Sequence, residues 1–247
     1  MRISLFVPCF IDQIYPNIAI QTVRLLWTLG VEVDYPKQQT CCGQPAFNTG
    51  YWREATALAK HFIDVFSGRG ENLIVSPSGS CISMITRFYQ ELPLPASYQQ
   101  RLKLLVPRCM ELSDYLANVI GERVIHGTWH QRAAYHHSCH LLRELGLKDE
   151  PFRLLQRVNG LDLVPWQDSA VCCGFGGTFS VKFPALSCAM TEEKLRSLQP
   201  LNVSYIIAND ASCLMQFDGL LRRRNSKIQV LHVVEVLARA MGIKEEL

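Results

Sequence analysis

The chain has 247 residues, of which 48% are hydrophobic and 19% are charged, and its formal net charge is only +3. This composition supports a sizeable buried core and excludes a disordered chain. The mixed and nearly balanced charge gives no basis for binding nucleic acid or an anionic membrane surface. No apolar stretch is long enough to span a bilayer and no secretory signal is recognisable, so we expect a cytoplasmic protein.

The hydrophobic pattern predicts alternating strands and helices in two successive runs. In chain order, the first run comprises strands at Ile3–Val7, Val31–Tyr35 and Leu73–Val75 and helices at Ile18–Leu29, Tyr51–Phe66, Ile82–Glu91 and Cys109–Ile120. The second run comprises strands at Ala133–His136, Leu161–Val164, Tyr205–Ala208 and Ile228–Leu231 and helices at Pro151–Val158, Pro184–Leu198, Ala211–Arg222 and His232–Met241. Strands joined by helical crossovers indicate an α/β fold with parallel sheets.

Ten cysteines are the most unusual feature of the chain, and eight of them repeat. Cys139 follows Cys9 by 130 residues, the pair Cys172 and Cys173 follows Cys41 and Cys42 by 131, and Cys213 follows Cys81 by 132. A glycine comes after both pairs. Such self-similarity at a fixed period indicates an internal duplication. We therefore predict two tandem βα repeats related by pseudo-two-fold symmetry, one at residues 1–125 and one at 126–247, with Cys109 and Cys188 as packing residues outside the pattern.

The repeated cysteines follow predicted strands. Cys9 comes after the first strand, Cys41 and Cys42 after the second, and Cys81 after the third. Because the carboxyl ends of parallel strands lie at one edge of a sheet, these four side chains are expected to converge there. The second repeat places its four cysteines in the same way. Convergence of this kind indicates two binding sites rather than packing.

Three chemistries are open to clustered cysteines. Disulfides are rare in a reducing cytosol, and adjacent Cα atoms lie about 3.8 Å apart, too close for an unstrained bridge. Zinc accepts four thiolates, but its cysteines usually come from C-x₂₋₄-C knuckles. An iron–sulfur cluster offers several iron atoms, so that two adjacent thiolates can each reach a different one. We favour an iron–sulfur cluster and keep zinc as the alternative.

The chain resembles the CCG (cysteine-rich) domain family on these residues. The motif is carried by Cys9, Cys41-Cys42-Gly43 and Cys81, and again by Cys139, Cys172-Cys173-Gly174 and Cys213. The resemblance covers nearly the whole chain and implies that all eight cysteines hold clusters, with at most one 4Fe–4S cluster in each repeat. The family also includes the catalytic subunit of heterodisulfide reductase. The size and the stand-alone pair of repeats look most like the lactate utilization protein A family.

One departure from the fuller family motif concerns a fifth cysteine. Where that motif has C-x-x-C, this chain has Ser78-x-x-Cys81 and Asp210-x-x-Cys213. Four cysteines suffice for an ordinary 4Fe–4S cluster. We expect Ser78 and Asp210 to be turn or helix-cap residues rather than oxygen ligands. For His136, His137 and His140, which flank Cys139, hydrogen bonding to backbone at the strand end is favoured over iron ligation or donation to a cluster sulfur.

The resemblance implies an iron–sulfur electron-transfer subunit of an oxidoreductase system that converts L-lactate to pyruvate. Its partners would be a ferredoxin-like iron–sulfur subunit and a third subunit of the lactate utilization system, together with an electron carrier or quinone. The chain would not be catalytic alone, and it shows no flavin or nicotinamide fingerprint. One alternative is a thiol–disulfide or quinone reductase subunit of the heterodisulfide reductase type. The other is a zinc-stabilised scaffold protein.

Overall fold

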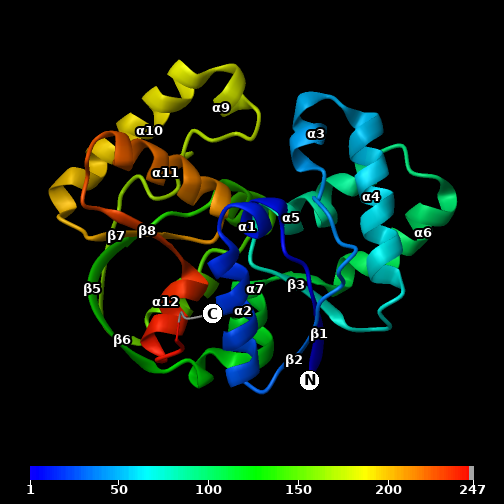
Figure 1. The fold of residues 1–247 in the computed structure, drawn as a ribbon, viewed down its shortest axis with the longest axis horizontal. Coiled ribbons are helices and arrows are strands. Elements are labelled where there is room, and N and C mark those ends of the chain that lie inside the picture. The colour runs from blue at the N-terminus through cyan, green and yellow to red at the C-terminus, as the bar shows by residue number, and fades with distance from the viewer. Residues whose placement is uncertain (245–247) are drawn as a thin grey trace.

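Two four-stranded parallel sheets form the framework of the computed structural model, which describes residues 1–244 (Figure 1). The first sheet has the order β2-β1-β3-β4 and the second has the order β6-β5-β7-β8. The strands of the first sheet are β1 (Arg2–Leu5), β2 (Glu32–Asp34), β3 (Leu73–Ser76) and β4 (Cys109–Glu111). Those of the second are β5 (Gly127–Tyr135), β6 (Val158–Val164), β7 (Tyr205–Ala208) and β8 (Gln229–His232). The predicted α/β fold with two tandem repeats is confirmed.

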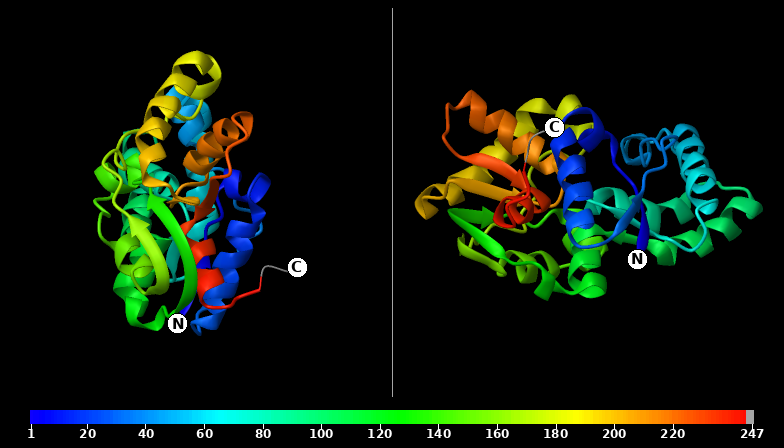
Figure 2. Two further views of the ribbon diagram at one scale, coloured as in Figure 1. Left: turned by 90° about the vertical axis from the view of Figure 1, so that its left-hand side faces the viewer. Right: turned by 60° about the horizontal axis from the view of Figure 1, so that its bottom comes forward.

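Helices cover both sheets (Figures 1 and 2). Those of the first repeat are α1 (Cys9–Gln13), α2 (Pro16–Thr28), α3 (Gln44–Thr49), α4 (Trp52–Ser67), α5 (Gly79–Ser83), α6 (Ala96–Leu105) and α7 (Leu112–Asp114). Those of the second are α8 (Glu150–Leu155), α9 (Phe179–Lys182), α10 (Pro184–Leu198), α11 (Ala211–Arg223) and α12 (Val233–Ala240). Wider π-helical turns occur at Met84–Phe88, Tyr115–Gly121 and His140–Glu144. Single 3₁₀ turns occur at Tyr89–Glu91, Val106–Arg108, Glu122–Val124 and Gln199–Leu201. Within residues 1–244 no helix is both long and apolar enough to cross a bilayer.

Two predicted helices have wrong boundaries. The expected helix at Cys109–Ile120 begins only at Leu112, because Cys109–Glu111 pairs in parallel with Ile74–Ser76 as an edge strand. A strand of three residues is too short to show a periodic pattern. The expected helix at Pro151–Val158 ends at Leu155, and Val158 already belongs to β6. In both places tertiary pairing overrides the local helical pattern.

The two repeats share one hydrophobic cluster, and each repeat has a further cluster of its own. Helix α2 packs against α12 where the sheets face each other, and Leu25 and Leu237 are both fully buried in the same cluster. Figure 1 shows these two helices side by side between the sheets. Burial of a leucine side chain contributes about 1.5–3 kcal/mol. The contact surface between the two repeats, called the seam below, therefore stabilises both of them. The boundary proposed near residue 125 stays a prediction, since the shared core does not test it.

The two repeats also pack against each other near their cysteines. Helix α1, which begins at Cys9, packs against α11, which contains Cys213. In the symmetric position, α5 with Cys81 packs against the turn His140–Glu144. A Cβ atom on Gly79 would lie only 2.8 Å from Cδ1 of Leu141, so glycine permits this close approach. The thiols of both repeats are therefore brought to the same seam.

Two buried titratable groups occupy equivalent places at this seam. Glu111 ends β4 and accepts from the Ser113 N–H, while His232 ends β8 and accepts from the Val234 N–H through Nδ1. Each also bonds across the seam, Glu111 to the Asn209 amide and His232 Nε2 to the Pro77 carbonyl at 3.1 Å. Burial raises the pKa of Glu111 to about 8 and lowers the pKa of His232 to about 4. Burial therefore favours the neutral form of both groups.

The neutral state of His232 predicts a specific acid sensitivity. Its folded pKa of about 4 lies below the unfolded value near 6.5, so the unfolded state binds more protons between these values. Its contribution to stability is fully present above pH 6.5 and is lost as the pH falls toward 4. Lowering the pH from 7 to 5 should cost about 2 kcal/mol through this residue. Because buried groups such as Glu111 titrate in the same range, the effect of His232 is the difference between two proteins. Between pH 7 and pH 5, we expect urea unfolding of the reduced, metal-free wild type to lose about 2 kcal/mol more stability than that of His232→Asn. An equal loss in the variant would contradict this assignment.

Candidate metal centre

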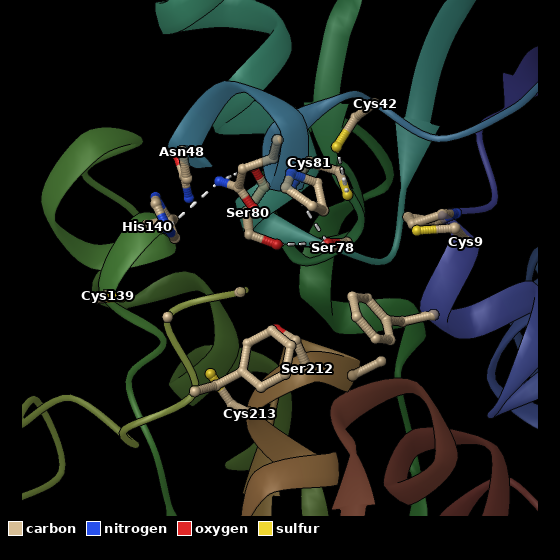
Figure 3. A pocket seen from close by; sticks show the side chains of 18 of the residues that line it. Cys9, Cys42, Asn48, Ser78, Ser80, Cys81, Cys139, His140, Ser212 and Cys213 are labelled. Carbon is tan, nitrogen blue, oxygen red and sulfur yellow. Dashed lines mark hydrogen bonds between the residues drawn. The ribbon is translucent and has the colours of Figure 1, made fainter. Parts of the chain in front are cut away.

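All eight repeated cysteines line one cavity at the seam between the repeats. Figure 3 labels five of them, Cys9, Cys42, Cys81, Cys139 and Cys213. Each of the eight lies just beyond the carboxyl end of a strand, as the sequence predicted. Within each group two thiols are buried and two are half-buried. The buried thiols are Cys42 and Cys81 in the first group and Cys173 and Cys213 in the second. The two groups therefore face a common space instead of occupying opposite ends of the molecule.

The sulfur atoms are close but not bonded. The Sγ–Sγ distances are 3.5 Å for Cys9 and Cys41, 3.3 Å for Cys42 and Cys81, and 3.3 Å for Cys173 and Cys213. All ten cysteines of the chain are free thiols. A disulfide would bring two sulfurs to about 2.05 Å, so these separations are those of unbonded thiols in contact with each other. Cys109 and Cys188 do not line the cavity.

A left-handed glycine follows each cysteine pair. Gly43 and Gly174 have φ values of +86° and +91°, which side-chain-bearing residues rarely adopt. Each glycine N–H donates to the sulfur two residues earlier, Cys41 or Cys172, at 3.4 Å. At Gly174 a Cβ atom would also lie 2.6 Å from the Ser187 carbonyl oxygen. The Cys-Cys-Gly sequence thus turns the backbone so that both thiols point to the cavity and an amide supports one of them.

The sulfur contacts polarise each group into thiolate and thiol members. Hydrogen bonds from the Cys42 and Cys9 thiols lower the pKa of Cys41 to about 3. Bonds from Cys139 and Cys173 lower the pKa of Cys172 to about 2. The donating thiols have raised pKa values in turn, since ionising them would lose these bonds and place like charges together. A soft metal or cluster would relieve this repulsion by binding the thiolates.

Ser78 and Asp210 join the two repeats to each other. The Asp210 carboxylate accepts from the Ser78 hydroxyl at 2.9 Å, the Ser80 hydroxyl at 2.7 Å and the Ser80 N–H at 3.1 Å. Ser78 also caps α5 by accepting from the Cys81 N–H at 3.4 Å, as expected for a cap residue. Asp210 makes no side-chain cap bond to its own helix and serves the helix of the other repeat. The side chains at the two positions that hold cysteine in the fuller motif are therefore hydrogen-bonded to each other.

The histidines beside Cys139 differ in their surroundings. His136 has the predicted backbone bond, from Nδ1 to the Ser169 carbonyl at 2.9 Å, and burial lowers its pKa to about 3. Its Nε2 atom is buried without a partner among residues 1–244. His140 instead bonds to the Glu144 carboxylate at 2.6 Å and lines the cavity. Burial lowers the pKa of His137 as well.

Lys194 is a functional neighbour that the sequence analysis missed. Its side chain is almost fully buried, and its ammonium donates to the carbonyls of Asp168, Ser169 and Val171 at 2.5, 3.0 and 2.5 Å. These carbonyls belong to the loop that leads into Cys172. Lys194 shares the buried face of α10 with Ser187 and Thr191, and three polar residues at helical spacing give no sequence signal of burial. The ammonium fixes the loop and places a positive charge near the second thiol group.

These residues fit a thiolate-bound metal group. Each group offers four sulfur atoms, and the second adds the bare nitrogen of His136 and a nearby cation. Thiolate sulfur suits both iron–sulfur clusters and zinc. The donor set excludes hard cations such as Mg²⁺ and Ca²⁺, which require oxygen ligands. The fold and the site therefore define a cysteine-rich, duplicated α/β protein whose clustered thiols could hold a soft metal or a cluster.

Comparison with known proteins agrees with this class. The cysteine-rich domain family, CCG, matches residues 3–86 and again residues 133–218. The chain belongs to this family. Both matches contain a complete set of four repeated cysteines.

Relatives and a solved structure extend the comparison. The chain is 42% identical to lactate utilization protein A from Halalkalibacterium halodurans, across all of both chains. It is also 42% identical to lactate utilization protein A from Geobacillus sp. strain WCH70, covering 96% of this chain and 99% of that one. The crystal structure of a hypothetical protein from Helicobacter pylori superposes with a TM-score of 0.66 at 11% identity, covering 98% of this chain and 49% of that one. That similarity concerns the fold alone.

The bridge from Asp210 to the first repeat predicts a large effect on stability. Asp210→Ala would leave the buried hydroxyl of Ser78 and the half-buried hydroxyl of Ser80 without their acceptor. We expect a loss of about 3 kcal/mol in the free energy of unfolding, measured by urea denaturation. Asp162→Ala is the matched control, because its ion pair with Arg132 is half exposed and should contribute less than about 1 kcal/mol. Equal losses in both variants would refute a joining role for Asp210.

Proposed function

We propose that this chain is an iron–sulfur electron-transfer subunit of a system that oxidises L-lactate to pyruvate. The observation that carries the proposal is the pair of four-thiol groups on one cavity. The lactate part is supported by the relatives named lactate utilization protein A, two of which match all and 96% of this chain. The protein acts in the cytoplasm, where a reducing environment keeps thiols free.

Each repeat supplies one set of ligands in this proposal. The first 4Fe–4S cluster is held by Cys9, Cys41, Cys42 and Cys81. The second is held by Cys139, Cys172, Cys173 and Cys213. Iron–sulfur ligation is favoured over zinc because adjacent cysteines can reach separate iron atoms, whereas zinc knuckles space their cysteines. Ser78 and Asp210 remain structural residues and not ligands.

The chain's own residues bind, shield and tune the clusters. Such clusters would supply one-electron transfer when bound. Burial of Cys42, Cys81, Cys173 and Cys213 keeps water from half of the ligand atoms. The N–H groups of Gly43 and Gly174 donate to ligand sulfurs and thereby favour the reduced state. No acid–base residue is needed in this role, so the hydride or proton chemistry of lactate belongs to another subunit.

The proposed assembly includes further proteins. Electrons would reach this chain from a substrate-oxidising centre and leave to a carrier or quinone. A ferredoxin-like iron–sulfur subunit and a third subunit of the lactate utilization system would be its protein partners. The chain alone would not oxidise lactate. This division distinguishes the role from that of a self-sufficient disulfide or quinone reductase.

Iron and sulfide content tests the ligand assignment. Protein purified and reconstituted without oxygen should contain about eight iron and eight sulfide per chain, and Cys42→Ala or Cys173→Ala should lose about half. Cys188→Ala is the control, since Cys188 lies outside the cavity and should leave both contents unchanged. Stoichiometric zinc without sulfide would contradict the proposal and support a zinc-stabilised scaffold.

The same samples test the lactate assignment. L-lactate should leave the visible absorption of the isolated chain unchanged and should bleach it once the two partner subunits are added. Bleaching in the isolated chain would show that substrate oxidation occurs here. No bleaching in the assembled system would remove lactate as the electron source while leaving the clusters in place.

A further inference from the structure

The two thiol groups differ at one equivalent position. The Phe6 N–H donates to the Val75 carbonyl at 2.9 Å, and the His136 N–H donates to the Ile207 carbonyl at 2.8 Å. These bonds place Phe6 and His136 at the same point of the two sheets. Phe6 packs edge-on against Phe62 with a centroid distance of 5.2 Å, and it offers no ligand atom. Only the second group has a nitrogen at this point.

The orientation of His136 leaves Nε2 free. Its Nδ1 atom lies 2.9 Å from the Ser169 carbonyl oxygen, which can only accept, so Nδ1 carries the hydrogen. The ring is 1% exposed, and the ring of Phe217 packs edge-on against it at 5.1 Å. In the neutral ring Nε2 therefore presents a lone pair. No partner for it exists within the described residues.

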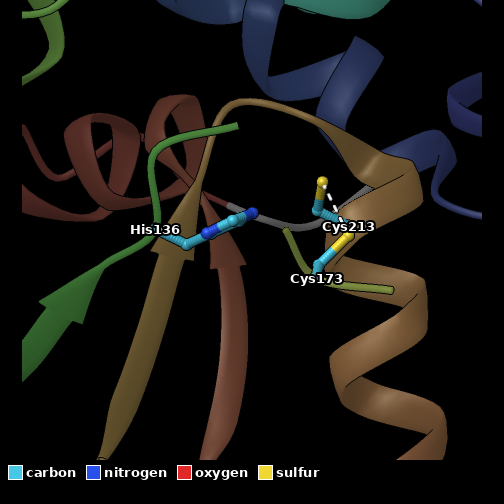
Figure 4. A group of neighbouring side chains, drawn as sticks. All are labelled: His136, Cys173 and Cys213. Atoms are coloured by element: carbon cyan, nitrogen blue, oxygen red, sulfur yellow. Dashed lines mark hydrogen bonds between the residues drawn. The ribbon is translucent and has the colours of Figure 1, made fainter. Parts of the chain in front are cut away.

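The free nitrogen faces two of the cysteines. Figure 4 shows the ring of His136 directed from the end of its strand toward Cys173 and Cys213. The ligand atoms of these three buried residues all lie within 4.8 Å of one another, and the two sulfurs are 3.3 Å apart. Two thiols and an imidazole nitrogen at this spacing form a donor set that would suit a soft metal.

The loop of the second site holds this orientation. The Ser169 carbonyl that fixes Nδ1 also accepts from Lys194 Nζ and from the His137 N–H, both at 3.0 Å. In the first repeat the corresponding backbone N–H, that of Val7, donates to the Gln39 side chain at 2.7 Å. The acceptor of this N–H is thus the Ser169 carbonyl in the second repeat and the Gln39 side chain in the first. That carbonyl dictates which ring nitrogen faces the thiols.

We propose that His136 Nε2 is a metal ligand of the second group, beside Cys173 and Cys213, so that this site has mixed nitrogen and sulfur ligation. The first site remains all-sulfur. This inference rests on the proposed function in assuming that the thiols hold iron. The four cysteines of the second group remain ligands, and the imidazole of His136 would be a fifth, neutral donor beside them.

Pulsed electron paramagnetic resonance on reduced protein tests the ligand directly. The full chain is labelled with ¹⁵N in its histidine rings only, reconstituted without oxygen and reduced with dithionite. We expect a strongly coupled histidine nitrogen in the wild type and its loss in His136→Phe, which reproduces the residue of the first repeat. His137→Phe is the neighbouring control and should retain the coupling. Cys81→Ala, which removes a ligand of the first site only, should retain it as well.

Iron and sulfide are measured on the same samples, so that two failures can be told apart. Iron and sulfide without a coupled histidine nitrogen in the wild type would overturn the inference and leave the proposed function standing. A coupling that persists in His136→Phe would overturn it equally. Absence of iron and sulfide would overturn the proposed function, and the inference would fall with it. The labelled wild type decides the first case even if a variant does not fold.

Discussion

The order of the parallel strands is the constraint on which both sites depend. β1 lies between β2 and β3, and β5 lies between β6 and β7. The chain therefore leaves the central strand toward one side and later returns on the other, which opens a crevice at the carboxyl ends. Cysteines separated by more than 70 residues, such as Cys9 and Cys81, meet only because of this order. No local interaction could bring them together.

The seam between the repeats adds a second level of dependence. Asp210 and Ser78 stand where the fuller family motif has cysteine, and they bond to each other across the seam. Two positions that are cysteine in the fuller motif therefore join the repeats beside the cavity that the two four-thiol groups line. The backbones of the two repeats are arranged symmetrically at the seam, but the side chains at equivalent positions differ. Phe10 packs on Phe175 at 5.4 Å, whereas the equivalent contact pairs His140 with Gln44.

The sequence predicted the elements that follow from local hydrophobic patterns, and it missed the features that depend on contacts between the two repeats. Strand Tyr205–Ala208 was predicted at its observed bounds because it is an apolar run of strand length. Helix Pro184–Leu198 was predicted at its observed bounds, and it begins at a proline and is followed by Pro200. The three-residue strand β4 was missed because it exists only through pairing with β3. The convergence of the eight cysteines followed from their strand-end positions. The buried Lys194 and the link between Ser78 and Asp210 were not predicted, since a single sequence shows neither burial of a charge nor contact between repeats.

The central claim is that two iron–sulfur clusters share one cavity, and their magnetic interaction tests it most directly. We would record electron paramagnetic resonance spectra of the fully reduced wild type and of Cys42→Ala and Cys173→Ala, each prepared without oxygen. Two clusters on a common cavity predict spectra broadened by spin–spin coupling in the wild type. Each variant should give the simple spectrum of one isolated cluster. A wild-type spectrum equal to the sum of two independent clusters, or no cluster signal, would contradict the account.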